Sequence, residues 1–145
     1  MTASTIAGLL AWQALDSRGK PTVGCEIRLE DGTLGQAIVP SGASAGRHEV
    51  VELRDGNAAY GGNGVRRAVE GLRAMVEPAI TGLDAADQAA LDRRLRELDG
   101  TPKLERLGGN AILAVSVAAA VATARRRPSP EQPERPALTR QAAEP

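Results

Sequence analysis

The sequence predicts a single α+β domain, with a three-stranded antiparallel meander followed by three or more helices. Two observations predict this fold. Between residues 9 and 39, apolar residues alternate with polar or small ones, as in half-buried strands. After Gly64 the apolar spacing becomes that of helices and stays so to about Ala124. Strands that come first and helices that follow are the pattern of an α+β domain.

The strands are read from three short runs. The clearest covers residues 22–29, where every second residue is apolar. Asp31-Gly32, a dipeptide typical of tight turns, separates it from residues 34–39, so these two runs should pair as an antiparallel hairpin. The earlier run at residues 9–15 is expected to add the third strand. The predicted inner face of the clearest strand consists of Val23, Cys25, Ile27 and Leu29.

Two of the helices have an apolar stripe. The first carries apolar residues at helical spacing over residues 65–80 and is expected to end near Gly82. Asp84 is expected to cap the second helix, and Asp99-Gly100 to end it. The stripe of this second helix consists of Leu91, Leu95 and Leu98.

The third helix, residues 111–124, is apolar on almost every side, because Ser116 and Thr123 are its only polar residues. It is too short to span a bilayer, so we expect it to be buried on several sides. A small domain must expose one side of a terminal helix, which here favours self-association or capture by a partner. The residues expected to be unevenly buried are Ile112, Leu113, Val115, Val117 and Val121.

The composition argues against several functions. The 18 basic and 18 acidic side chains balance, so the net charge indicates neither a nucleic-acid nor an acidic-membrane partner. With Trp12 and Tyr60 as the only aromatic residues, stacking on bases is not a plausible main activity. Cys25 is the single cysteine and is expected in the core rather than as a nucleophile. No basic leader or long apolar run occurs, so the expected setting is cytoplasmic and reduced.

A change in composition near Arg125 predicts a domain boundary. All 16 glycines precede it, whereas five of the nine prolines follow it. Few large apolar residues follow, and such a segment cannot offset the entropy lost on ordering. We therefore expect a folded domain at residues 1–126 and a disordered tail at residues 127–145.

A loop of small residues after the last predicted strand is the first candidate site. Its glycines and serines would let backbone N–H groups and two hydroxyls approach an anion or a hydrated cation. A loop of this kind is also commonly a simple connector. It is not a P-loop, because no Gly-Lys-Ser/Thr follows. After Pro40, the loop consists of Ser41, Gly42, Ala43, Ser44, Ala45 and Gly46.

A polar cluster after this loop is the second candidate. It would supply a proton-transfer pair or a carboxylate metal site on one interpretation. On the other interpretation it is a solvated group of ion pairs, which the spacing alone favours. The cluster consists of His48, Glu49, Glu52, Arg54 and Asp55.

Several short motifs follow one another along the chain. They are residues 15–23 (LDSRGKPTV), 39–46, 52–56, 61–69, Asp87-Gln88 with Asp92, 98–101 and 107–113 (LGGNAIL). Their shared order resembles that of the enolase N-terminal domain over about residues 5–124. Residues 15–23 resemble the family's opening signature, with Lys20 where Asn is usual. Residues 39–46 resemble its mobile loop.

The resemblance implies a part in the dehydration of 2-phosphoglycerate to phosphoenolpyruvate, with a lysine base and two Mg²⁺ ions, as is usual in this superfamily. In the family these groups belong to a barrel domain, and this chain has no counterpart of the base lysine, the acid glutamate or the metal-binding carboxylates. By position, Ser44 matches the serine that closes over the substrate and ligates the second Mg²⁺, with residues 41–46 as the lid. We therefore expect no activity from the chain alone.

Besides Lys20, three further positions depart from the family. Ala45 stands where Thr is usual. The resemblance implies that Trp12 and Gly24 replace an arginine and an acid that form ion pairs across the family's dimer, so the usual dimer is not expected. The leading hypothesis is a capping domain that works with a barrel supplied in trans, or a truncated enolase. A non-catalytic module that binds enolase or another protein, and a decaying gene product, stay open, and so does whether the chain is part of an enzyme.

Overall fold

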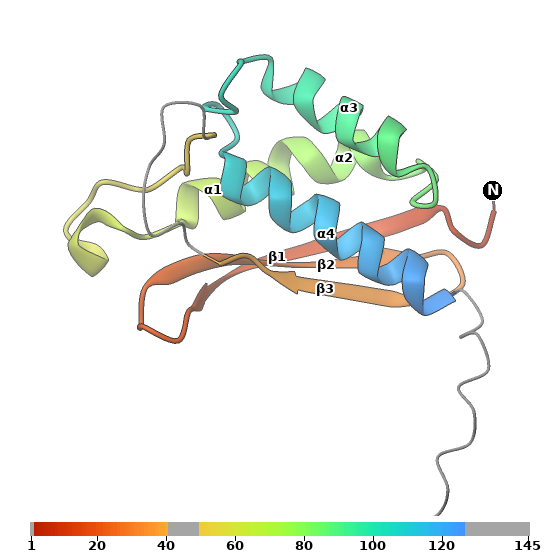
Figure 1. The fold of residues 1–145 in the computed structure, drawn as a ribbon, viewed down its shortest axis with the longest axis horizontal. Coiled ribbons are helices and arrows are strands. Elements are labelled where there is room, and N and C mark those ends of the chain that lie inside the picture. The colour runs from red at the N-terminus through yellow and green to blue at the C-terminus, as the bar shows by residue number, and fades with distance from the viewer. Residues whose placement is uncertain (1, 41–49, 127–145) are drawn as a thin grey trace, which may run out of the picture.

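A computed structural model of the chain describes residues 2–40 and 50–126. Figure 1 shows a small sheet with the helices on one of its faces, which confirms the predicted α+β arrangement of a meander followed by helices. The predicted loop at residues 41–46 and the predicted tail at residues 127–145 lie outside the described residues. The three strands, each antiparallel to the next, are β1 (Ile6–Leu15), β2 (Pro21–Leu29) and β3 (Leu34–Ile38).

The alternation in the sequence correctly predicts which face of the sheet is buried. The four inward residues expected on β2 are almost completely buried, so Cys25 is confirmed as a core residue. The turn after β2 is tight as expected, and Gly32 takes a left-handed conformation there, with φ of 86°. β1 begins three residues before the expected start at Leu9, because Ile6 still pairs with Leu29 beyond an irregularity in the register.

On each outer strand, one backbone carbonyl accepts a hydrogen bond from an arginine side chain. Arg73 Nη2 donates to the carbonyl of Ala11 on β1 at 2.9 Å. Arg125 Nη1 donates to the carbonyl of Leu34 on β3 at 2.8 Å. Unpaired edge carbonyls are templates for edge-to-edge pairing, so these contacts help to protect the sheet.

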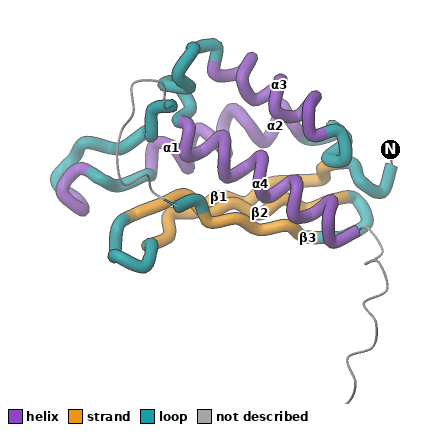
Figure 2. The backbone as a smooth tube through the Cα atoms, in the orientation of Figure 1, coloured by secondary structure: helices purple, strands orange, loops and turns teal. Residues whose placement is uncertain are grey.

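The helices form a layer over the inner face of the sheet (Figure 2). The predicted first helix has a wide π-helical turn in its middle. Pro78 accounts for this turn, because proline lacks an N–H and its ring clashes with the preceding turn of a regular α-helix. The helical elements are η1 (Ala59–Gly62), α1 (Arg66–Gly71), η2 (Leu72–Val76), α2 (Glu77–Ile80), α3 (Gln88–Asp99) and α4 (Gly109–Arg126).

The predicted cap of α3 is wrong. Asp87 caps the helix, and its carboxylate accepts a hydrogen bond from the N–H of Ala90 at 3.0 Å. Asp84 instead accepts from the N–H of Ala86 in the preceding turn. Both aspartates suit a cap, so residue type alone did not distinguish them. The end of α3 is as predicted, with Gly100 in the left-handed conformation.

α4 packs along β2 and β3 (Figure 1). Gly35 makes this approach possible, because a Cβ there would overlap backbone atoms of Ala118 and Ala122. The two alanines are completely buried, so helix and strand backbones meet closely. The short distance between α4 and the sheet thus explains why the helix is rich in alanine, because larger side chains would not fit between the two backbones.

Candidate functional site

The chain leaves the sheet for residues 41–49 at a well-anchored point. The N–H of Val39 donates to the carbonyl of Val23 at 3.1 Å. The carbonyl of Val39 accepts the hydroxyl of Thr22, and Val39 itself is buried. The chain before this segment is therefore held against β2 up to its last residues.

The chain is anchored again where the description resumes. The N–H of Val51 donates to Lys103 O at 2.9 Å, and its carbonyl accepts from the N–H of Gly109 at 2.7 Å. Asn110 Oδ1 accepts from the N–H of Leu53 at 3.0 Å, and its Nδ2 donates to Leu53 O at 3.2 Å. The Asn110 amide thus pairs with one backbone residue as a neighbouring strand would.

Two glycines at the start of α4 make this anchor possible. A Cβ on Gly108 would lie 2.5 Å from Asn110 Oδ1 and 2.6 Å from Leu53 Cβ. A Cβ on Gly109 would overlap the side chain of Val50. The two glycines of the LGGN motif therefore let the returning chain lie directly against the helix.

Arg54 joins this returning chain to two other segments. Its Nη1 donates to the carbonyls of Pro21 at 2.5 Å and Asn63 at 2.8 Å. Its Nη2 pairs with the carboxylate of Glu52 at 2.8 Å. Asp55 accepts from the N–H groups at the start of α1, where negative charge is favourable. These contacts agree with the ion-pair interpretation of the described part of the polar cluster.

His48 and Glu49 of that cluster, like the loop itself, lie outside the described residues. The structure therefore describes neither the predicted loop residues nor the part of the polar cluster that follows them directly. What it does show is the frame that holds both ends of residues 41–49.

The turn between β1 and β2 is part of the same frame. Asp16 Oδ1 accepts from the N–H groups of Arg18 at 2.8 Å and Lys20 at 2.9 Å. The bond from Lys20, and then that from Arg18 with its charge, lower the pKa of the Asp16 carboxyl although desolvation opposes them. The carbonyl of Pro21, which accepts from Arg54, immediately follows this turn.

The described residues do not fit a Mg²⁺ site. They contain no group of three His, Cys, Asp or Glu side chains that could hold a metal ion. Ser44, the one residue of this chain that the resemblance implies as a metal ligand, lies outside them. Burial, and then the charge of Glu26, raise the pKa of the Cys25 thiol to about 12, so it stays protonated and offers no thiolate ligand.

An apolar surface lies beside the second anchor. The contact between Val50 and Gly109 places Val50 at the start of α4, and Leu113 and Val117 follow at one-turn intervals on the same side. Leu113 is 48% exposed and Val117 is 40% exposed, whereas Ile112 is buried. The predicted uneven burial is thus what the structure shows. We call Val50, Leu113 and Val117 the α4 patch.

These features define an α+β domain that anchors the chain on both sides of residues 41–49 and exposes apolar side chains of α4 beside the second anchor. None of its described helices has the length and apolar character needed to cross a membrane. Residues 6–131 match the family model described as enolase, N-terminal domain. This match covers most of the chain, so the chain belongs to the enolase N-terminal domain family. It extends five residues past the predicted boundary at residue 126.

Sequence reasoning did not identify the residues that build the frame. Asn110 was expected only to open a helix, and Arg54 to take part in surface ion pairs. A signal existed in residues 107–110, because two glycines before a buried polar residue indicate a close backbone approach. Nothing in that motif indicated that Leu53 is the partner.

Proposed function

We propose that this chain is the capping domain of an enolase. Its loop, residues 41–46, contributes substrate and Mg²⁺ contacts to the conversion of 2-phosphoglycerate to phosphoenolpyruvate and water, a lyase reaction of glycolysis in the cytoplasm. A barrel domain supplies the remaining groups, in trans or within an assembly. The domain itself carries no counterpart of the family's base, acid or carboxylate ligands, so on its own it has no turnover.

The α4 patch is the observation that best supports this proposal. It combines exposed apolar side chains with the anchor that follows residues 41–49. A barrel that covered the patch would therefore lie beside the loop. At about 25 cal/mol per Å², covering a few hundred Å² of apolar surface contributes several kcal/mol before the entropic cost of association.

The frame has a specific part in this function. When bound, Mg²⁺ neutralises charge that develops on the substrate. The residues of this chain position the loop. Asn110 and Val39 each hold the backbone near one end of residues 41–49, and Arg54 ties the returning end to the β1–β2 turn. Fixed ends reduce the number of conformations the loop must lose when it closes on a substrate.

Reconstitution tests the proposal. The chain is mixed with a separately produced enolase barrel domain, and phosphoenolpyruvate formation is followed by ultraviolet absorbance with excess 2-phosphoglycerate and Mg²⁺. We expect turnover only in the mixture. In the mixture, Ser44→Ala should lower activity at limiting Mg²⁺ on the order of 10-fold to 100-fold, as is typical when metal-site support is lost.

Ser17→Ala is the matched control, because Ser17 is exposed in the β1–β2 turn, and it should keep full activity. Mg²⁺-dependent turnover by the chain alone would contradict the proposal. An unchanged rate for Ser44→Ala would contradict the role of the loop serine.

The α4 patch also supports a second function, a non-catalytic module that binds enolase or another protein. Binding to the barrel without turnover, lost on Leu113→Lys, would favour this alternative. Neither binding nor turnover would favour a decaying, truncated gene product.

A further inference from the structure

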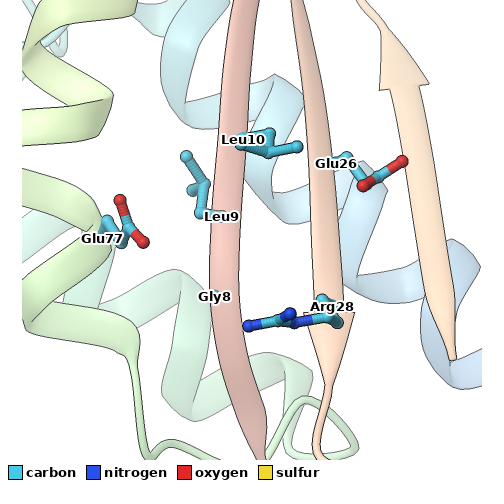
Figure 3. A pocket seen from close by; sticks show the side chains of 6 residues that line it. All are labelled: Gly8, Leu9, Leu10, Glu26, Arg28 and Glu77. Carbon is cyan, nitrogen blue, oxygen red and sulfur yellow. The ribbon is translucent and has the colours of Figure 1, made fainter. Parts of the chain in front are cut away.

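A small pocket lies at the edge of β1, far along β2 from the point where Val23 holds the chain before residues 41–49 (Figure 3). Its volume is about 210 Å³, equivalent to roughly seven water molecules at ~30 Å³ each. Pockets for drug-sized ligands have volumes of about 300–1,000 Å³, so this pocket suits a smaller molecule. It is lined by Gly8, Leu9, Leu10, Glu26, Arg28 and Glu77.

The backbone of β1 is irregular beside this pocket. Its register with β2 shifts between Ile6 and Gly8, and Gly8 then pairs with Arg28. Bulges in strands are frequent next to active sites, where they change the direction of a side chain. Glycine inside a strand often marks a place where a ligand or another backbone approaches closely. The local backbone is therefore of the kind found at binding sites.

Two opposite charges flank Gly8. Arg28 extends from β2 across β1, and Glu77 lies beyond β1 at the start of α2 (Figure 3). Arg28 Nη2 lies 3.5 Å, and Glu77 Oε1 lies 3.8 Å, from the position that a Cβ on Gly8 would take. Both groups are thus close to one point, yet none of the ion pairs in the described part of the chain joins them.

These two side chains are the charges that a ligand can use. Within residues 2–40 and 50–126, neither takes part in a hydrogen bond or an ion pair. Glu77 is half-buried, and a charge that is partly removed from water without a partner is costly. Glu26 differs, because it accepts from Gln36 Nε2 at 2.5 Å and points toward β3 in Figure 3.

An apolar wall completes the pocket. The side chain of Leu10 is 63% exposed and lies beside the two charges, and Leu9 also contributes to the lining. A molecule in this pocket therefore meets one cation, one anion and an aliphatic surface.

We propose that this pocket binds a free α-amino acid with an aliphatic side chain. The carboxylate of the ligand pairs with the Arg28 guanidinium, whose fork of N–H donors matches two carboxylate oxygens. The ammonium group pairs with Glu77. In an α-amino acid both groups are attached to one carbon, so the protein charges that receive them must lie close together without touching, as they do here. The aliphatic side chain covers Leu10 and removes apolar surface from water.

This site goes beyond the proposed function. It uses no residue of the loop at residues 41–46 or of the α4 patch, and binding requires neither Mg²⁺ nor a barrel domain. It can therefore be tested on the chain alone.

An NMR titration of the full chain with L-leucine is the direct test. We expect the amide signals of Gly8, Leu9 and Leu10 to shift in a saturable way, with a Kd on the order of 1 mM, because a small ligand has few atoms with which to gain affinity. Isocaproate lacks the ammonium group of leucine, and isoamylamine lacks its carboxylate. Each should bind about 10-fold more weakly than leucine, since each loses one charge-assisted contact.

Variants assign the two contacts. Arg28→Gln and Glu77→Gln should each weaken leucine binding about 10-fold. Gly8→Val keeps both charges but fills the space between them, and should weaken binding by at least as much. Valine suits a strand, and a Cβ at this position would meet only the ends of two flexible side chains, so this variant should fold.

Two controls separate this pocket from other sites. Glu70→Gln removes a carboxylate from the exposed side of α1 and should leave leucine binding unchanged. Leu113→Lys alters the α4 patch and should also leave it unchanged, so a failure of the proposed barrel docking does not affect this result. Circular dichroism checks that every variant is folded.

Four outcomes would overturn the proposal. The wild-type chain could show no saturable shift at tens of millimolar leucine, or it could bind isocaproate or isoamylamine as tightly as leucine. Unchanged leucine binding by folded Gly8→Val would show that the ligand lies elsewhere. Shifts centred on α4 would place leucine on the α4 patch instead.

Discussion

Replacement of Asn110 by alanine should loosen the chain that follows residues 41–49 more than any surface contact of this domain. The side chain is only 5% exposed, and it accepts from the N–H of Leu53 and donates to its carbonyl. Asn110→Ala removes both bonds and leaves two backbone groups without partners. Each such group costs about 1–3 kcal/mol, so we expect a loss of about 2–6 kcal/mol in the free energy of unfolding. That is a large share of the ~5–15 kcal/mol typical of a domain.

Urea denaturation followed by circular dichroism measures this loss, provided that the m-value stays constant. Hydrogen exchange of the Leu53 amide supplies a local measurement, and exchange should become faster in Asn110→Ala. Asn57→Ala is the matched control, because Asn57 accepts a single bond from the N–H of Ala59 in an exposed turn. Its cost should stay below about 0.5 kcal/mol. Equal stability of the two variants, with unchanged exchange at Leu53, would refute the anchoring role.

Three further predictions follow from buried contacts. Gly35→Ala should destabilise the domain by about 3 kcal/mol or more in thermal melts, because a Cβ there overlaps the backbone of α4. Gly32→Ala, in open space but at positive φ, should cost only about 1–2 kcal/mol, and the reverse order would contradict the packing argument. Burial alone would raise the pKa of Asp99, but hydrogen bonds from Leu107 and Thr101 hold it below its usual value. Its stabilisation is therefore present above the unfolded pKa of about 3.9 and lost as pH falls through the folded value. Asp99→Asn should accordingly have a melting temperature that falls less than the wild type's on acidification, and an equal fall would exclude Asp99 as a contributor. The Cys25 thiol, with its pKa raised to about 12, should not react with a thiol reagent at about pH 8.5 until denaturant is added, and rapid reaction of the folded chain would show that the core opens readily.

The layers of this fold can be read from the sequence because they depend on local periodicity. A period of two marks β2, and its four inward residues are buried as expected. The tight turn at Gly32 and the helix end at Gly100 follow from glycine's access to positive φ. Features that depend on small local differences were not predictable, such as the choice of Asp87 over Asp84 as a cap and the π-helical turn before Pro78.

The frame around residues 41–49 could not be predicted because its bonds join distant segments. Arg54 reaches Pro21, 33 residues earlier, and Asn110 reaches Leu53 across 57 residues. Periodicity reports which side of one element is buried and carries no information about which backbone group a polar side chain meets. The resemblance to enolases located the motifs that meet in the frame, but not the contacts between them.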